Sequence, residues 1–204
     1  MNSKLGKILY FSYFFPPTGG ISCQRTIRFV KYLKKYGWDI TVVASGDFKS
    51  WRVIDNSLLE KVKDVKKVTY SLRRIASFYN GEKNLANLKL AIRSIHGLDP
   101  MHIWTREVKL DLDRLIKKHK PDIAIITIPP FSTAELAESI KKIDGKIKVI
   151  LDIRDLFWVF KPYGSFMRRV ANIAQNYFAQ KKFQIWMKYF DGFIVPDESF
   201  TATI

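Results

Sequence analysis

Residues 7–44 read KILYFSYFFPPTGGISCQRTIRFVKYLKKYGWDITVVA, and this stretch decides the fold. Its apolar start predicts a buried strand, and residues 21–37 follow with the apolar spacing of a helix. Residues 38–44 form a second, almost uninterrupted apolar run, which is typical of a strand in a parallel sheet buried on both faces. The stretch therefore predicts a βαβ unit with a right-handed crossover.

The loop FFPPTGG, residues 14–20, lies between the first strand and the helix. Its prolines keep the chain extended, while Gly19 and Gly20 allow a ligand to approach the backbone closely. Free N–H groups and the helix dipole converge at such a helix start, which favours phosphate binding. The alternative is a tight turn without a ligand.

The helix of residues 21–37 has two distinct faces. We expect one face to be buried, and its members are Cys23, Ile27, Val30 and Leu33. Cys23 is therefore expected to pack in the core rather than to act in catalysis. Arg25 is a candidate substrate-binding residue if it reaches a cleft, and otherwise it solvates its own face; we slightly favour solvation.

The same alternation of strand and helix continues along the chain. Further strands are predicted at 65–70, 122–128, 146–153 and 191–196, and further helices at 84–95, 107–120, 132–143 and 165–189. Ser132 and Glu135 have the spacing of a capping box. The prediction is one α/β domain over residues 1–204, a doubly wound, mostly parallel Rossmann-like sheet with helices on both faces. A less regular basic insertion occupies about residues 45–105.

Charge and composition limit the partners. Lys and Arg number 35 against 19 acids, giving a net charge of +16, which favours nucleic acid, an anionic membrane or anionic ligands. The single cysteine excludes an intramolecular disulfide and a cysteine-based zinc cluster, and we expect no metal site. No apolar run approaches the roughly 18–20 residues that span a bilayer. We expect a cytoplasmic location.

Three unusual loops follow predicted strands: FFPPTGG, PPFS at 129–132 and RDLFW at 154–158. Because the carboxyl ends of parallel strands meet at one sheet edge, these loops predict a cleft there. Arg154 and Asp155 either face a ligand or form a structural pair, for which Asp152 competes. His96, His102 and His119 lie outside these loops and are interpreted as surface residues.

In this order the loops resemble GT-B fold glycosyltransferases of family 4. The similarity is carried by residues 13–45, by GLDPMHIWTREV (97–108), by KPDIAIITIPPFSTAELAESIKK (120–142) and by VILDIRDLFW (149–158). The resemblance implies the N-terminal, acceptor-side half of a retaining enzyme that transfers a sugar from a nucleotide-sugar donor to a lipid-linked or envelope polysaccharide acceptor. No other cofactor is implied.

The resemblance also implies site residues. Gly19 and Gly20 would face the donor diphosphate, where backbone N–H groups stabilise the charge of the leaving phosphate. Pro129, Arg154 and Asp155 would line the acceptor side or the cleft floor, and no residue matches a general base. The donor-binding C-terminal domain of the family is absent from this sequence, so we expect the chain alone to be incomplete and inactive, with the missing domain supplied in cis or in trans.

The basic excess also predicts contact with an anionic membrane, because each basic residue near such a surface contributes on the order of 1 kcal/mol. The candidates are Arg73, Arg74, Arg168, Arg169, Lys181 and Lys182. The helix at 165–189 is expected to bury Val170, Ile173, Tyr177 and Ile185 and to expose its charges. The protein would then sit peripherally on the inner face of the plasma membrane.

Two other functions compete with sugar transfer. A basic nucleic-acid-binding α/β module without catalysis is suggested by charge alone, but the sequence has no helix-turn-helix, zinc or RNA-recognition signature. An NAD-binding protein needs G-x-G-x-x-G after the first strand, and PPTGGISCQ lacks that spacing.

Overall fold

The structure, a computed structural model, describes residues 5–46, 53–70, 99, 101–155 and 166–196. In the last helix it describes the side chains of residue 173 and of residues 176 onward. The helices are α1 (Ile21–Lys35), α2 (Ser57–Glu60), α5 (His102–His119), α6 (Leu136–Ile143) and α7 (Phe166–Met187), with a 3₁₀ helix, η1, at Phe131–Glu135.

A six-stranded sheet forms the centre of the molecule, and every pairing within it is parallel. Its order is β3-β2-β1-β4-β5-β6, so the direction of winding reverses between β1 and β4. The strands are β1 (Gly6–Phe11), β2 (Trp38–Ser45), β3 (Lys66–Tyr70), β4 (Ile123–Ile128), β5 (Lys148–Ile153) and β6 (Gly192–Ile194). This is the doubly wound Rossmann-like order, in which ligands bind beyond the carboxyl ends of the strands near the reversal.

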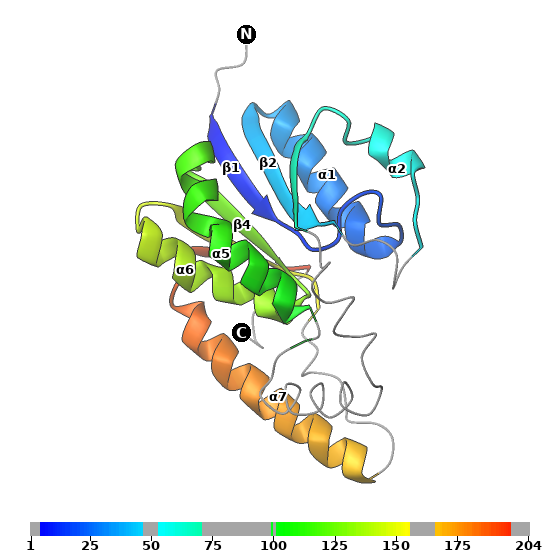
Figure 1. Cartoon of the computed structure of the whole chain (residues 1–204), viewed down its shortest axis with the longest axis vertical. Coiled ribbons are helices and arrows are strands. Elements are labelled where there is room, and N and C mark those ends of the chain that lie inside the picture. The colour runs from blue at the N-terminus through cyan, green and yellow to red at the C-terminus, as the bar shows by residue number, and fades with distance from the viewer. Residues whose placement is uncertain (1–4, 47–52, 71–98, 100, 156–165, 197–204) are drawn as a thin grey trace.

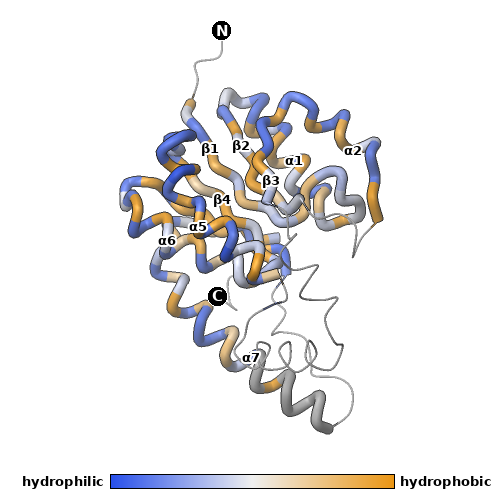
Figure 2. Tube along the Cα trace, in the orientation of Figure 1, coloured by the Kyte–Doolittle hydropathy of each residue, from blue (hydrophilic) through white to orange (hydrophobic). Residues whose placement is uncertain are grey.

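Helices cover both faces of the sheet (Figure 1). Ile8 and Tyr10 of β1 pack with α1 and α2, whereas Leu9 and Phe11 pack with α5, α6 and α7. Successive strand residues point to opposite faces, so a strand covered on both sides must be apolar throughout. Figure 2 shows that apolar residues predominate along the central strands, whereas apolar and polar residues alternate along the helices. The predicted fold class is confirmed.

Most predicted elements are present with small shifts at their ends. On α1, Cys23, Ile27 and Val30 are buried as expected, whereas Leu33 is half-buried. Gly37, whose φ is 98°, follows the helix end, where the left-handed conformation favours glycine. Helix α5 begins five residues earlier than predicted, at His102 rather than 107. The helix predicted at 84–95 lies outside the described residues.

The predicted capping box at Ser132 and Glu135 is wrong. The backbone N–H of Ser132 donates to Oδ2 of Asp99 at 2.6 Å, and the Ser132 hydroxyl bonds instead to the hydroxyl of Thr105 at 3.1 Å. Glu135 forms an ion pair with Lys109. A carboxylate distant in sequence therefore takes the capping role that local spacing assigned to serine.

The buried face predicted for α7 is also wrong. Ile173, Tyr177 and Ile185 are 58%, 55% and 55% exposed. The side chain of Val170 lies outside the described ones. The buried residues are Ala179, Phe183 and Trp186, and the rings of Phe183 and Trp186 lie 5.6 and 5.4 Å from that of Phe131 in η1. Apolar residues occur on several sides of α7, so contact with η1 rather than helical spacing selects the buried side.

Among the described residues, no helix combines the length and apolarity needed to cross a membrane.

Candidate functional site

A cavity of about 750 Å³ lies where the N-terminal half of α1 meets the residues that follow β5 and β6. It is thus at the carboxyl edge of the sheet, where the three loops predicted a cleft. Its lining is mainly basic and apolar, formed by Ile21, Gln24, Arg25, Arg28, Phe29, Arg154, Asp155 and Pro196. The lining has three guanidinium groups and one carboxylate, and the three cations still outnumber the acids when the buried partner of Arg25 is counted, so the cavity favours an anionic ligand.

Arg25 is held in this cavity by a buried carboxylate, which corrects the expectation that it only solvates α1. Its Nε and Nη2 lie 2.9 and 2.8 Å from Oδ1 of Asp152, whose side chain is completely buried. The Arg25 side chain remains 27% exposed, and its guanidinium also lies 5.3 Å from the centre of the Phe29 ring. An ion pair with one buried member fixes the arginine, because moving it away leaves a buried charge uncompensated.

Two hydroxyl groups complete the surroundings of Asp152. The Tyr10 and Thr127 hydroxyls each lie 3.2 Å from Oδ2, and 3.2 Å from each other. Burial, followed by the neighbouring Asp152 charge, raises the pKa of Tyr10 well above its ordinary value, so the phenol remains a proton donor. Strands β1, β4 and β5 therefore jointly support one ion pair with α1.

Arg154 joins the end of β5 to the start of α1. Its Nη1 donates to the carbonyl of Ser22 at 2.8 Å, and its backbone N–H donates to Ile128 at the end of β4. Asp155 is exposed, and the structure gives no ion pair between it and Arg154. The alternative in which Arg154 and Asp155 form a structural pair is therefore not observed, and Asp152 pairs with Arg25 instead.

The two adjacent glycines have different surroundings. Gly19 is buried, and its N–H donates to the carbonyl of Val53 at 2.7 Å, so this amide is not free for a phosphate. Gly20 is exposed, has a φ of 87°, and would have no atom within 4 Å of an added Cβ. No described side chain caps the start of α1. The open part of the predicted bend is therefore Gly20 and the first turn of α1.

The remaining predicted residues lie near the cavity or away from it. Pro129 directly follows β4 but does not line the cavity. Cys23 is buried, as expected, with Sγ 3.3 Å from the Gly20 carbonyl, and burial raises the pKa of its thiol. His102 is half-buried, as is His119, whose Nδ1 lies 3.3 Å from the hydroxyl of Thr41; His96 lies outside the described residues. Neither described histidine lines the cavity.

The cavity can bind and orient an anion, but its described lining has no histidine or cysteine to transfer a proton. Within the described parts of the chain, no three His, Cys, Asp or Glu residues are grouped to hold a metal ion. A phosphate there would meet arginine side chains and the positive end of α1, both of which stabilise negative charge.

The predicted membrane-facing residues are only partly described. Arg73 and Arg74 lie outside the described residues, as do the side chains of Arg168 and Arg169. Lys181 is exposed, with Nζ 5.8 Å from the ring centre of Tyr177, whereas Lys182 is half-buried and burial lowers its pKa.

Sequence reasoning missed Tyr10 and Thr127. Their signal is weak, because a tyrosine and a threonine are both common in strands. Only the polar Asp152 within VILDI, at a position covered on both faces, indicated that buried hydrogen-bond partners were needed.

Comparisons with known proteins add little. No family model and no curated protein matches the chain. One matching solved structure is the Clostridium thermocellum family 3 carbohydrate esterase, which is 13% identical, with a TM-score of 0.39, over 93% of this chain and 77% of that one. A similarity this low says nothing of the activity of the chain.

Proposed function

We propose that the chain is the acceptor-binding half of a retaining glycosyltransferase, which transfers a sugar from a nucleotide-sugar donor to a lipid-linked or envelope polysaccharide acceptor. The observation that supports this most is the arginine-lined cavity beside the open start of α1. The proposal also rests on the family resemblance of the loops that surround this edge.

In this proposal the cavity stabilises the diphosphate that leaves the sugar. Arg25 is held in place by Asp152, and Arg154 is tied to the first turn of α1, so both charges are oriented before a ligand arrives. Preorganised charge is more effective than mobile charge, because no reorganisation is needed when the bond breaks. Gly20 leaves room for a phosphate to approach the N–H groups of the helix.

A donor-binding domain, in cis or in trans, completes the site in this proposal. It supplies most of the nucleoside contacts, and the present chain supplies the anion-stabilising surface, which itself binds the diphosphate, and the contacts with the acceptor.

We also propose that the protein binds the membrane peripherally at its inner face. Support comes from α7, where Ile173, Tyr177, Lys181 and Ile185 recur every four residues and are all exposed. A row of apolar residues with an interspersed lysine suits the interface of an anionic bilayer. The N-terminal half of α7, which carries Ile173, extends beyond the sheet (Figure 1), and the other three residues of the row lie in the C-terminal half, on its exposed side.

The experiment is a screen of nucleotide sugars with a lipid extract as acceptor, in which the chain is assayed alone and with a candidate donor-binding domain. We expect release of nucleoside diphosphate from at least one donor, lowered at least tenfold by Arg154→Gln. Arg106→Gln, which removes an exposed arginine on α5 that does not line the cavity, is the matched control. If no donor reacts under either condition, or if both variants behave alike, the proposal is wrong.

A further inference from the structure

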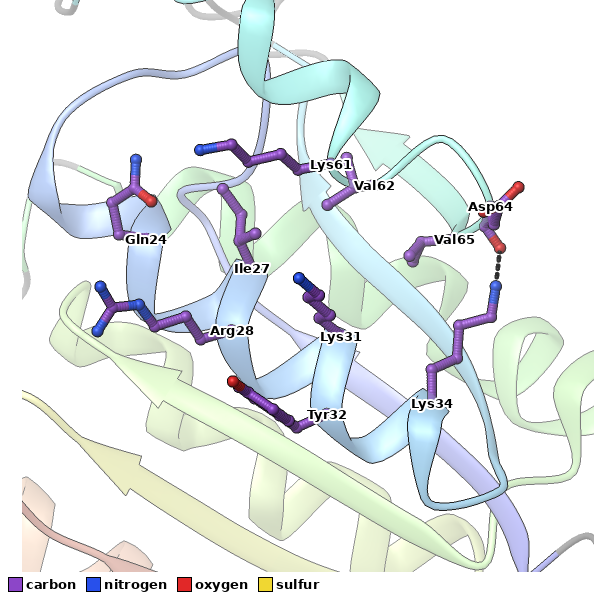
Figure 3. A pocket seen from close by; sticks show the side chains of 10 residues that line it. All are labelled: Gln24, Ile27, Arg28, Lys31, Tyr32, Lys34, Lys61, Val62, Asp64 and Val65. Atoms are coloured by element: carbon purple, nitrogen blue, oxygen red, sulfur yellow. Dashed lines mark hydrogen bonds between the residues drawn. The ribbon is translucent and has the colours of Figure 1, made fainter. Parts of the chain in front are cut away.

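A second basic cavity, of about 720 Å³, adjoins the arginine cavity along α1, and both are lined by Gln24 and Arg28. Its walls are α1 and the turn at residues 61–65 (Figure 3). The lining is formed by Gln24, Ile27, Arg28, Lys31, Tyr32, Lys34, Lys61, Val62, Asp64 and Val65. We call it the α1 groove.

Cations line both walls of the α1 groove. Arg28 and Lys31 extend from α1, and Lys61 extends from the facing turn (Figure 3). None of these three forms an ion pair with another described residue, and all three are exposed. Lys34 donates to the backbone carbonyl of Asp64 at 2.5 Å, which ties the two walls together near one end of the groove.

The charge of the α1 groove is therefore not balanced locally. Four basic side chains line it against one acid, Asp64, and the hydrogen bond from Lys34 engages the carbonyl of that residue rather than its carboxylate. Helix α1 itself contains five basic residues and no acid. Like charges held close together repel one another, and a bound anion removes that repulsion.

The floor of the groove differs from its rim. Ile27 and Val62 are buried and Val65 is half-buried, while the ring of Tyr32 is 53% exposed at one side. An apolar floor beneath a basic rim suits a ligand that has a charged group and a less polar body.

We propose that the α1 groove is a second anion-binding site, which recognises a phosphate-bearing ligand through Lys31, Lys61 and Arg28. The same chemistry is offered by a soluble phosphorylated compound and by the headgroup of an anionic lipid. Arg28 also lines the arginine cavity, so the two sites share one cation.

Lysine footprinting of the full chain tests this proposal at 150 mM salt. Acetylation of each lysine is measured by mass spectrometry without ligand, with inorganic pyrophosphate, with phosphatidylglycerol vesicles and with phosphatidylcholine vesicles. We expect acetylation of Lys31 and Lys61 to fall at least fivefold with pyrophosphate if the groove binds a soluble phosphorylated compound, or with phosphatidylglycerol vesicles if it binds a lipid headgroup. Lys118 and Lys146, which are exposed on other elements, should stay reactive.

A double variant, Lys31→Gln with Lys61→Gln, removes two lysines from the groove. The control is a second double variant, Lys118→Gln with Lys146→Gln, which removes the same charge elsewhere. We expect the affinity for the protecting ligand to fall at least tenfold in the double variant of Lys31 and Lys61, and less than twofold in the double variant of Lys118 and Lys146. Absence of protection in every arm, equal protection of Lys118 and Lys146, or equal loss in the two pairs overturns the proposal.

The outcome is independent of the proposed sugar transfer. Arg154 does not line the α1 groove, so Arg154→Gln should leave the protection of Lys31 and Lys61 unchanged even where it abolishes nucleoside diphosphate binding.

Discussion

At the scale of single residues, Asp152 has the largest consequences. It is completely buried, and it is the ion-pair partner of Arg25 as well as the hydrogen-bond partner of Tyr10 and Thr127. Asp152→Asn removes the charge that Arg25 faces, and we expect the free energy of unfolding to fall by about 3 kcal/mol. Urea denaturation measures this change.

The control for that prediction is Asp155→Asn, three residues further along the same segment. Asp155 is exposed, and its loss should change the free energy of unfolding by less than about 0.5 kcal/mol. Similar losses in both variants would contradict the assignment of the ion pair to Asp152.

Gly19 is a position of close backbone approach. An added Cβ would lie 3.0 Å from the carbonyl oxygen of Val53 and 3.1 Å from Cβ of Asp55. We expect Gly19→Ala to lower the free energy of unfolding by about 1–2 kcal/mol, because the neighbouring segment must move. For Gly145→Ala the nearest atom is 3.7 Å away, so a thermal melt should show little change; an equal drop in both melts would contradict the prediction.

Asp191 makes the stability of the fold depend on pH. Burial alone would raise its pKa, but hydrogen bonds from Lys141, from the backbone N–H of Val149 and from Lys148 outweigh this and lower the pKa to about 2. A lowered carboxyl pKa stabilises the fold above the ordinary pKa near 3.8, and that stability is lost as the pH falls toward 2.

Comparison of the wild type with Asp191→Asn tests this dependence. We expect the wild type to be more stable by about 1 kcal/mol at pH 7, since the carboxylate is partly hydrated, and the difference to disappear by about pH 2. Urea midpoints at the two pH values give the answer, and a difference that grows in acid would contradict the role of Asp191.

At the scale of elements, α7 carries the prediction about membranes. Tyr177→Ser with Ile185→Ser removes two exposed apolar residues without touching the buried ones. We expect at least a threefold loss of binding to phosphatidylglycerol vesicles in sedimentation, because less apolar area enters the bilayer interface.

The matched control for α7 is Leu110→Ser, at a residue on α5 that is 72% exposed. It should leave vesicle binding unchanged. Equal loss in both proteins, or no vesicle binding by the wild type, would show that α7 is not the contact surface.

The comparison of α1 with α7 explains which elements were predictable. On α1 one side is apolar and the other basic, so burial of Cys23, Ile27 and Val30 followed from spacing alone. On α7 apolar residues point in several directions, and the choice of Phe183 and Trp186 depends on the Phe131 ring, which lies far away in the sequence.

The candidate site, like the helices, was predictable in part from the sequence. The chain order of the loops placed Arg154 and Gly20 at one edge, because parallel strands bring their carboxyl ends together. The pairing of Arg25 with Asp152 joins residues 127 positions apart and depends on side-chain geometry that no local pattern encodes. The hydrogen bond from the Gly19 N–H to the Val53 carbonyl, which makes this amide unavailable to a ligand, likewise joins residues that no local pattern connects.

At the scale of the whole molecule, the topology brings the positive end of α1, the arginines of α1 and Arg154, which follows β5, to one edge of the sheet. The strand order reverses between β1 and β4, and the carboxyl end of β5, next to β4, carries Arg154. The account therefore depends on the arginine cavity being an anion site for the diphosphate of a nucleotide sugar.

Calorimetric titration of the chain with uridine, guanosine and adenosine diphosphates tests this claim most directly. We predict that at least one of them binds, and that Arg154→Gln weakens its binding at least tenfold while Arg106→Gln leaves it unchanged. Failure of all three to bind, or binding that is the same in the wild type and in Arg154→Gln, would contradict the account.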